Sequence, residues 1–125
     1  MTENDISYDI RGAAFKVHTN LGPGLLESVY EFAMAHELSK MGYDVWTQVG
    51  LPVVYDGIKL ELGYRIDLLV NDMVVVEIKS VDALADVHHK QVLTYLKLSG
   101  KKLGLLINFN VSSIKDSIVR IVNNL

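Results

Sequence analysis

The 125-residue sequence contains no cysteine, which excludes disulfide bonds and thiolate metal sites and agrees with a reducing compartment. It also has no long apolar run. Charged residues interrupt every hydrophobic stretch well before the ~20 residues that a membrane-spanning helix needs. The opening residues 1–5 are acidic and polar, so we expect neither a signal peptide nor a transit peptide. These absences favour a cytoplasmic protein that does not enter a membrane.

The sequence also lacks an excess of positive charge. Its 12 Lys and Arg against 15 Asp and Glu give a formal net charge of −3 and a pI near 5.7. Proteins that hold duplex DNA through many phosphates usually carry a basic excess, because neutralising phosphates drives that binding. Three alternatives remain open: a small local contact with nucleic acid, a contact supplied by another subunit, or a different ligand.

Hydrophobic residues, in contrast, are abundant. They make up 50% of the chain, and the mean hydropathy is +0.23. No repeat, low-complexity tract or linker divides the sequence, so we expect a single domain over residues 1–125. The surplus apolar content would also suit a homodimer or a partner subunit.

Hydrophobic spacing predicts helices first and strands afterwards. Apolar residues three and four apart predict a helix over residues 5–21, and a second from about 25 to 41 follows the break at Gly22-Pro23-Gly24. Strand patterns and turn residues then predict strands over 44–55, 59–70 and 73–79, a helix over 82–98, a strand over 103–109, and a final strand or short helix over 114–122. The order α-α-β-β-β-α-β predicts an α/β (α+β) fold with a mixed sheet covered by helices.

The predicted strand 73–79 ends in two charged residues. Its first four residues are apolar on both faces, as in a central strand. Glu77 and Lys79 then follow two residues apart, so their side chains share one face. Charge at the end of a core strand is costly unless it is paired or binds a metal. The simpler alternative is a Glu–Lys ion pair at a solvated strand end.

Asp67 interrupts the preceding apolar strand ten residues before Glu77. A two-residue loop at 71–72 would leave the two carboxylates on opposite faces of the sheet. A three-residue loop at 71–73 would place them directly across from each other, with Cβ atoms about 5 Å apart. Carboxylates that close repel each other unless a cation lies between them. We therefore predict an odd-length loop or a bulge at this turn.

Helical residues could complete such a site. Glu27 lies in the first turn of the second predicted helix, with Tyr30 on the same side, although the helix dipole alone would favour a carboxylate there. In the later helix, His88, Gln91 and Tyr95 form one polar and aromatic stripe. A solvated amphipathic face explains His88 and Tyr95 about equally well.

The segment from Gly24 to Tyr30 matches a Gly-x-x-Glu-x-x-Tyr signature, and the sequence resembles the GxxExxY family that is named after it. The resemblance spans about residues 8 to 122 and includes segments 16–18, 21–24, 64–70, 76–79, 95–96 and 103–109, with His88 and Gln91. That family is classed with the PD-(D/E)XK nuclease superfamily, whose core is a helix, a three-strand meander, a helix and a further strand. The element order predicted above agrees with that core.

The resemblance also implies roles for individual residues. Asp67 is similar to the motif aspartate of the superfamily, although Ile66 stands where the name-giving proline would be. Glu77 and Lys79 are similar to its Glu-x-Lys, and Glu27 resembles the helical glutamate that adds a metal ligand in many members. In the helix that follows, Gln91 and Tyr95 resemble the glutamine and tyrosine of the RecB-like branch.

The chemistry that this resemblance implies is metal-dependent hydrolysis of phosphodiester bonds in nucleic acid, with DNA as the expected substrate. Hard carboxylate oxygens favour Mg²⁺ or Mn²⁺, held by Glu27, Asp67, Glu77 and the backbone carbonyl of Ile78. Lys79 would orient the attacking water and offset charge on the phosphate. Gln91 would position Lys79 or the nucleophile.

Four further residues are expected to contact the substrate: Tyr95, Tyr30, His88 and His18. For His18, a structural hydrogen bond is an equally good explanation. The competing function is a non-catalytic module that binds nucleic acid or protein and retains the nuclease fold. The acidic balance favours that module, whereas the presence of all four residues Glu27, Asp67, Glu77 and Lys79 opposes it.

Overall fold

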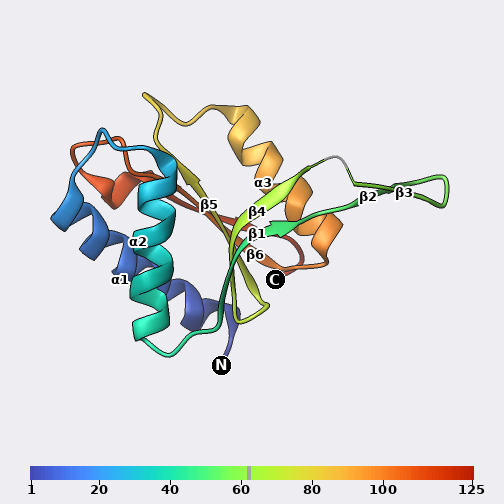
Figure 1. Cartoon of the computed structure of the whole chain (residues 1–125), viewed down its shortest axis with the longest axis horizontal. Helices are drawn as coiled ribbons and strands as arrows, with labels where there is room; N and C mark the ends of the chain where they lie inside the picture. The colour runs from blue at the N-terminus through green and yellow to red at the C-terminus, as the bar shows by residue number, and fades with distance from the viewer. Residues whose placement is uncertain (62) are drawn as a thin grey trace.

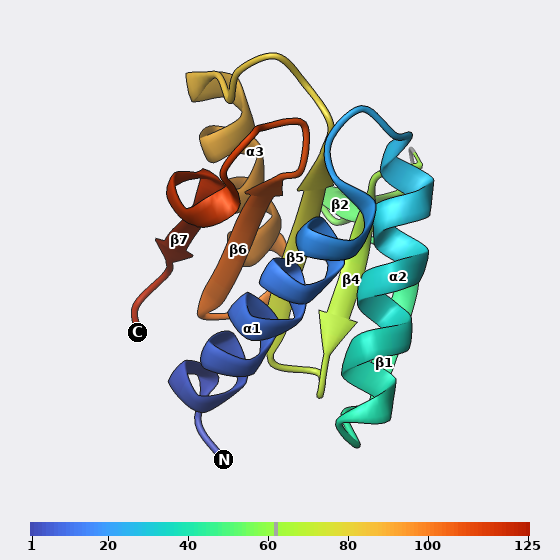
Figure 2. The same cartoon turned by 90° about the vertical axis from the view of Figure 1, so that its left-hand side faces the viewer.

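The computed structural model describes residues 1–61 and 63–125. A central sheet has two helices on one face and one helix on the other (Figures 1 and 2). The helices are α1 (Glu3–Leu21), α2 (Glu27–Lys40), α3 (Asp86–Ser99) and a short 3₁₀ helix, η1 (Ile114–Ser117). None of the helices in this described part of the chain is long and apolar enough to cross a membrane.

The strands of the described residues form two sheets. They are β1 (Val45–Gly50), β2 (Val53–Tyr55), β3 (Ile58–Leu60), β4 (Arg65–Val70), β5 (Val74–Lys79), β6 (Leu103–Asn108) and β7 (Ile118–Val122). The main sheet has the order β1-β4-β5-β6-β7, while β2 and β3 form a separate hairpin. Only the β5–β6 pair is parallel among these pairings, because α3 carries the chain across the sheet between those two strands. The predicted mixed sheet with covering helices is confirmed.

Two buried clusters hold the helices on the sheet. The helix α1 starts at a capping box between Thr2 and Asp5 and buries one apolar stripe, as its spacing predicts. That stripe packs with α2 and with one face of β4, β5 and β6. The second cluster lies under α3 on the other face and includes Val92, Tyr95 and Leu96. The sheet is therefore covered on both sides.

Helix α3 begins at Asp86, four residues later than the predicted start at 82. The connection from β5 is held by other partners: Ser80 N donates to Glu27 Oε2 (3.0 Å) and Val81 N donates to Asn108 Oδ1 (3.1 Å). These bonds hold the chain in an irregular path directly after β5. The helix then starts after Ala85, which is its N-cap and whose N–H is accepted by His88 Nδ1. The final segment contains both predicted alternatives in succession, since η1 leads directly into β7.

The two long strands predicted over 44–55 and 59–70 are wrong in their extent. Each is divided, and the outer parts form the β2–β3 hairpin, which projects from the body (Figure 1). Pro52 has no N–H to donate to a ladder, and Gly63 has a φ of +80°, so the strands cannot continue through these positions. Leu51 N donates to Tyr64 O (2.9 Å) at the base of the hairpin. Leu62, which the predicted strand included, lies outside the described residues.

Candidate active site

The turn between β4 and β5 sets the register of the candidate site. Met73 N donates to Val70 O (3.0 Å), and Asn71 and Asp72 have φ values of 51° and 54°, which are left-handed conformations that Asn and Asp tolerate. The loop therefore spans three residues, and the pairs that follow are Val70–Val74, Leu69–Val75 and Leu68–Val76. The next step of this register places Asp67 opposite Glu77. The predicted odd-length loop is confirmed.

At the next position of the β4–β5 pair, the side-chain carboxylates of Asp67 and Glu77 take the place of backbone carbonyls as hydrogen-bond acceptors. Asp67 N donates to Glu77 Oε1 (3.1 Å), and Ile78 N donates to Asp67 Oδ2 (2.8 Å). Glu77 is only 4% exposed. No carboxylate among the described residues lies within 4.0 Å of the Lys79 ammonium, so the simple Glu–Lys ion pair at a solvated strand end is not what the structure has. We call Glu27, Asp67, Glu77 and Lys79 the carboxylate–lysine site.

Burial dominates the electrostatics of this pair. The pKa of Glu77 is raised to about 8, first by burial and then by the charge of Asp67, while the Asp67 N–H and the charge of Lys79 oppose the rise. Burial also raises the pKa of Asp67, against the Ile78 N–H, the Gln48 amide and the charge of Lys79, while the charge of Glu27 adds to the rise. A buried carboxyl group whose pKa is raised by burial and by a neighbouring carboxylate favours a bound proton or cation.

Glu27 approaches the same site from α2. It is the first residue of that helix, and its Oε2 accepts the Ser80 N–H one residue beyond Lys79. Ser80 Oγ also donates to Leu25 O (2.7 Å), so the start of α2 is tied to the end of β5. Glu27 therefore lies beside the strand that carries Glu77 and Lys79, as well as at a helix N-terminus.

Tyr30 cannot contact a substrate, and that prediction is wrong. Its side chain is 0% exposed, and its ring stacks on Phe109 with a centroid distance of 4.5 Å. The hydroxyl donates to Gly22 O (2.6 Å) and accepts from Leu25 N (3.1 Å). The tyrosine of the Gly-x-x-Glu-x-x-Tyr signature thus fixes the loop that leads into Glu27.

The structure adds two residues that the sequence analysis missed, Glu31 and Gln48. Gln48 Nε2 lies 3.0 Å from both Glu31 carboxylate oxygens and 3.3 Å from Asp67 Oδ1. Burial raises the pKa of Glu31, the Gln48 amide lowers it, and the charge of Asp67 raises it further. Glu31 lies four residues after Glu27 on the same helix face, and this spacing in the sequence could have predicted that Glu31 lies near the site. Gln48 gave no sequence signal.

Helix α3 contributes Gln91 and Tyr95 to the edge of the site. Gln91 Nε2 donates to the Tyr95 hydroxyl (3.0 Å), so its amide is directed at Tyr95. Burial raises the pKa of Tyr95, and the charge of Glu77 raises it further. Tyr95 packs in one cluster with Val75, which lies two residues before Glu77 on the same face of β5. The predicted stripe on α3 is therefore partly buried, because Tyr95 packs on the sheet.

The two predicted histidines have structural partners. His88 Nδ1 accepts the Ala85 N–H (2.9 Å) and so caps the start of α3. His18 Nε2 lies 2.7 Å from the carbonyl oxygen of Val111, which is the structural hydrogen bond that was the alternative for this residue. Both side chains support the loops around the site, and their role in substrate binding stays a prediction.

The donor set suits a small divalent cation. Within residues 1–61 and 63–125, no three Asp, Glu or His side chains converge closely enough to form a complete metal cage. Mg²⁺, however, usually retains several waters and is held by one or two carboxylates together with substrate phosphates. Asp67 and Glu77 provide two facing carboxylates. Of the two Glu77 oxygens, only Oε1 accepts a hydrogen bond from the described residues, so Oε2 is available to a cation. Both Asp67 oxygens accept one, from Gln48 and Ile78. Hard oxygen donors of this kind fit Mg²⁺ or Mn²⁺.

The comparison with known families agrees with this geometry. The model of the PD-(D/E)XK nuclease superfamily matches residues 4–121 of the chain. No curated protein and no solved structure matches it significantly. The match covers nearly the whole sequence, including all four residues of the carboxylate–lysine site. The chain therefore belongs to the PD-(D/E)XK nuclease superfamily.

Proposed function

We propose that the chain hydrolyses phosphodiester bonds in nucleic acid, with DNA as the expected substrate, and that it depends on Mg²⁺ or Mn²⁺. The observation that carries the proposal is the contact of the buried Glu77 with Asp67, on the strand that also carries Lys79. Among the described residues, no carboxylate pairs with the Lys79 ammonium. Acidic groups with strongly perturbed pKa values cluster at functional sites. Membership of a nuclease superfamily adds independent support.

The carboxylate oxygens of Asp67, Glu77 and Glu27, with the carbonyl of Ile78, would hold the cation. When bound, the ion supplies a water of lowered pKa and polarises a phosphate oxygen. Lys79 shares the strand face of Glu77 and would donate to a phosphate oxygen, so that charge developing during the reaction is stabilised.

Gln91 and Tyr95 would act at the edge of the site. Their mutual hydrogen bond holds the phenol of a side chain that packs against β5 beside Val75. The role predicted for Gln91, positioning Lys79 or the nucleophile, would then be exerted through Tyr95. Tyr95 would contact the substrate backbone with its hydroxyl. Within the superfamily, we assign the chain to the GxxExxY proteins and to the RecB-like branch on the residues Glu27, Tyr30, Gln91 and Tyr95.

A second candidate is a non-catalytic binding module that retains the fold. The formal net charge of −3 favours it, because little positive charge is left to hold a long duplex. In such a module Asp67, Glu77 and Lys79 would have no reaction to perform. The two candidates therefore predict different effects of Lys79→Ala on cleavage.

The test is cleavage of single-stranded, duplex and branched DNA and of RNA with Mg²⁺ or Mn²⁺. We expect the parent chain to cut at least one substrate and Lys79→Ala to lose ~10²-fold or more of that activity, as when a charge-stabilising group is removed. Lys115→Ala removes an exposed lysine of η1 and is the matched control. Equal cleavage by Lys79→Ala and the parent would contradict catalysis at this site, and no cleavage of any substrate would favour the binding module.

A further inference from the structure

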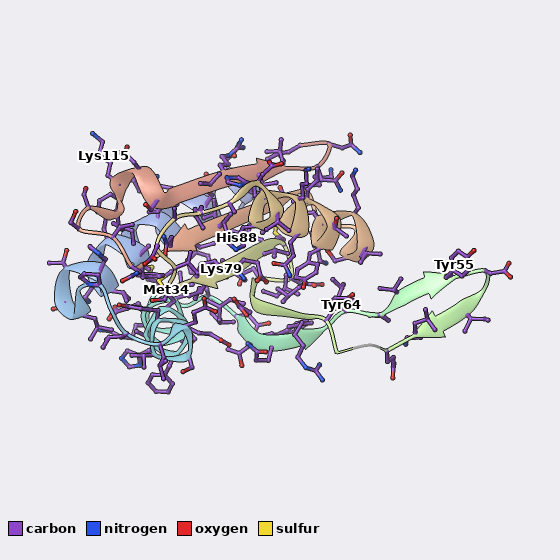
Figure 3. All side chains as sticks on the ribbon, turned by 90° about the horizontal axis from the view of Figure 1, so that it is seen from above. Met34, Tyr55, Tyr64, Lys79, His88 and Lys115 are labelled. Carbon is purple, nitrogen blue, oxygen red and sulfur yellow. The ribbon has the colours of Figure 1, made fainter. Side chains whose placement is uncertain are left out.

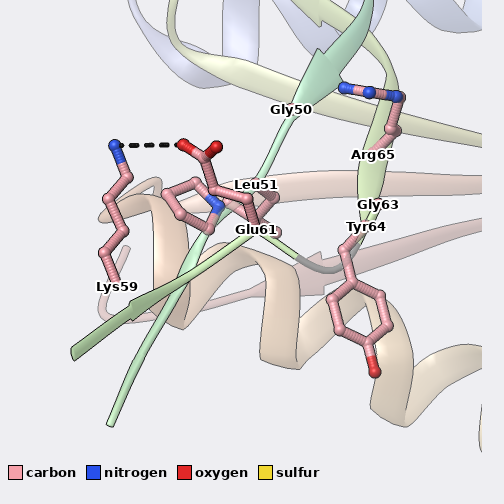
Figure 4. A pocket seen from close by; sticks show the side chains of 8 residues that line it. Gly50, Leu51, Lys59, Glu61, Gly63, Tyr64 and Arg65 are labelled. Atoms are coloured by element: carbon pink, nitrogen blue, oxygen red, sulfur yellow. Dashed lines mark ion pairs between the residues drawn. The ribbon is translucent and has the colours of Figure 1, made fainter.

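A groove lies where the β2–β3 hairpin meets α3. Its volume is about 310 Å³, within the range of ligand pockets, and it is lined by Val53, Tyr64, Gln91, Thr94, Tyr95 and Leu98. We call it the Tyr64 groove. A separate hollow of about 470 Å³ lies at the hairpin base and also includes Tyr64, together with the ion-paired Lys59 and Glu61 (Figure 4). In that view the Tyr64 ring points away from the ion pair.

Tyr64 is the aromatic side chain that the groove exposes. It is 45% exposed, whereas Tyr95 is 6% exposed, and the two ring centroids lie 6.4 Å apart at an interplanar angle of 61°. In Figure 3, Tyr64 lies at the hairpin base, between the tip marked by Tyr55 and the body that holds Lys79. An aromatic ring supported on an edge by a buried neighbour is well placed to stack with a flat ligand.

The groove adjoins the carboxylate–lysine site through Tyr95. The Tyr95 ring packs in one buried cluster with Ile66 of β4 and Val75 of β5. Ile66 directly precedes Asp67, and Val75 lies two residues before Glu77 on the same face of its strand. Tyr95 therefore lies between the Tyr64 groove, which it lines, and the strands that carry the two carboxylates.

The lining of the groove selects a neutral, flat ligand with a hydrogen-bonding edge. None of its six residues carries a formal charge, and its polar groups are the amide of Gln91 and the hydroxyls of Thr94, Tyr64 and Tyr95. Such a lining would not hold a phosphate, which needs positive charge or several N–H donors. An aromatic base offers both a π-face for Tyr64 and polar edge atoms for the amide.

We propose that the Tyr64 groove receives a nucleobase of a single-stranded nucleic acid whose backbone lies at the carboxylate–lysine site, with Tyr64 as the stacking residue. The inference rests on the proposed function of that site. Stacking contributes ~1–3 kcal/mol per base and needs no positive charge, which suits an acidic chain. A base inside a duplex must first leave the stack to reach the groove. Single strands, frayed ends and flaps are therefore the preferred substrates.

The test measures binding instead of cleavage. Oligonucleotides of about 12 nucleotides, as DNA and as RNA, carry one 2-aminopurine whose fluorescence falls on stacking, and each is used as a single strand and as a duplex. Binding is measured in Lys79→Ala, with and without Mg²⁺, so that no substrate is consumed. The additional substitutions are Tyr64→Ala, Tyr64→Phe and, as the matched control, Tyr55→Ala at the hairpin tip, where the tyrosine is 75% exposed.

We expect tighter binding of the single strand than of the duplex, a loss of about tenfold in Tyr64→Ala, and little change in Tyr64→Phe or Tyr55→Ala. The 2-aminopurine signal should be quenched by Lys79→Ala and restored when Tyr64→Ala is added. Equal binding by Tyr64→Ala, equal affinity for the duplex, or no binding of either oligonucleotide would overturn the inference.

The outcomes separate this inference from the proposed function. If single strands bind in a Tyr64-dependent way but the parent cleaves nothing, the proposed hydrolysis fails and the base-binding groove stands. If the parent cleaves duplex and single strand alike and Tyr64→Ala changes neither, the groove assignment fails and the hydrolysis stands. The DNA and RNA arms show which sugar the site accepts.

Discussion

The substitution Glu77→Gln in the metal-free chain isolates the free energy of ionising a buried carboxyl group. Glu77 is 4% exposed, and its pKa is raised from 4.5 to about 8 by burial first and by the charge of Asp67 second. Glutamine has nearly the same size and keeps an oxygen that accepts the Asp67 N–H, but it carries no charge. The variant therefore changes the electrostatics of the site with little change in packing.

The sign of the effect follows from the direction of the pKa change. A carboxyl group whose pKa is higher in the folded chain binds its proton more tightly when folded, so the free energy of unfolding falls as pH rises. For Glu77 the loss begins near the unfolded pKa of 4.5 and is complete above the folded pKa of about 8. At ~1.4 kcal/mol per pH unit this amounts to roughly 4 to 5 kcal/mol, partly shared with Asp67 because coupled groups titrate as a pair.

The assay is urea unfolding of EDTA-treated protein from about pH 5 to 9. We expect Glu77→Gln to become more stable than the parent as pH rises, by about 3 kcal/mol or more at the alkaline end. Glu61→Gln removes an exposed carboxylate, whose side chain is 77% exposed, and should show no such trend. Parallel loss of stability in the parent and in Glu77→Gln above about pH 6 would refute the reasoning.

Two further substitutions test the support of the site. Tyr30→Phe removes the hydroxyl that joins Gly22 O and Leu25 N, while the ring can still stack on Phe109. We expect the free energy of unfolding, measured in urea, to fall by about 1 to 2 kcal/mol. Limited proteolysis should also cut the loop before Glu27 sooner. Unchanged stability and proteolysis would contradict the role of that hydroxyl. Gly104→Ala would place a Cβ atom 2.8 Å from Val92 Cγ1 under α3. We expect the free energy of unfolding in urea to fall by about 1 to 3 kcal/mol. Cleavage should also weaken, because Gln91 and Tyr95 move with the helix. A fully stable and active Gly104→Ala would show that α3 need not pack this closely.

Local sequence patterns predicted most of the fold. The stripe of α1 is buried as its three-and-four spacing requires, and β5 and β6 are buried strands as their apolar runs indicate. The divided strands were not predictable in the same way. Pro52 is a signal in the sequence against one continuous strand over 44–55. Only the tertiary structure, however, shows that the outer strands leave the main sheet and pair with each other.

The site was predictable in parts. Glu77 and Lys79 follow from charge at the end of an apolar strand, and the position of Asp67 follows from the length of one turn. The late start of α3, the amide of Gln48 between Glu31 and Asp67, and the burial of Tyr30 depend on contacts between segments far apart in the sequence. No local pattern records those contacts, so the sequence predicted the positions of Asp67 and Glu77 on their strands better than it predicted their surroundings.

The central claim is that Asp67 and Glu77 bind a divalent cation, and calorimetric titration of Mn²⁺ into the metal-free chain tests it most directly. We predict one site that is lost in Asp67→Asn and in Glu77→Ala and retained in Glu61→Gln. The bound ion should also stabilise the parent by ~2.7 kcal/mol at a hundredfold excess over Kd, and neither site variant should gain this stability. Mn²⁺ binding of equal affinity in the parent and in both site variants would contradict the claim.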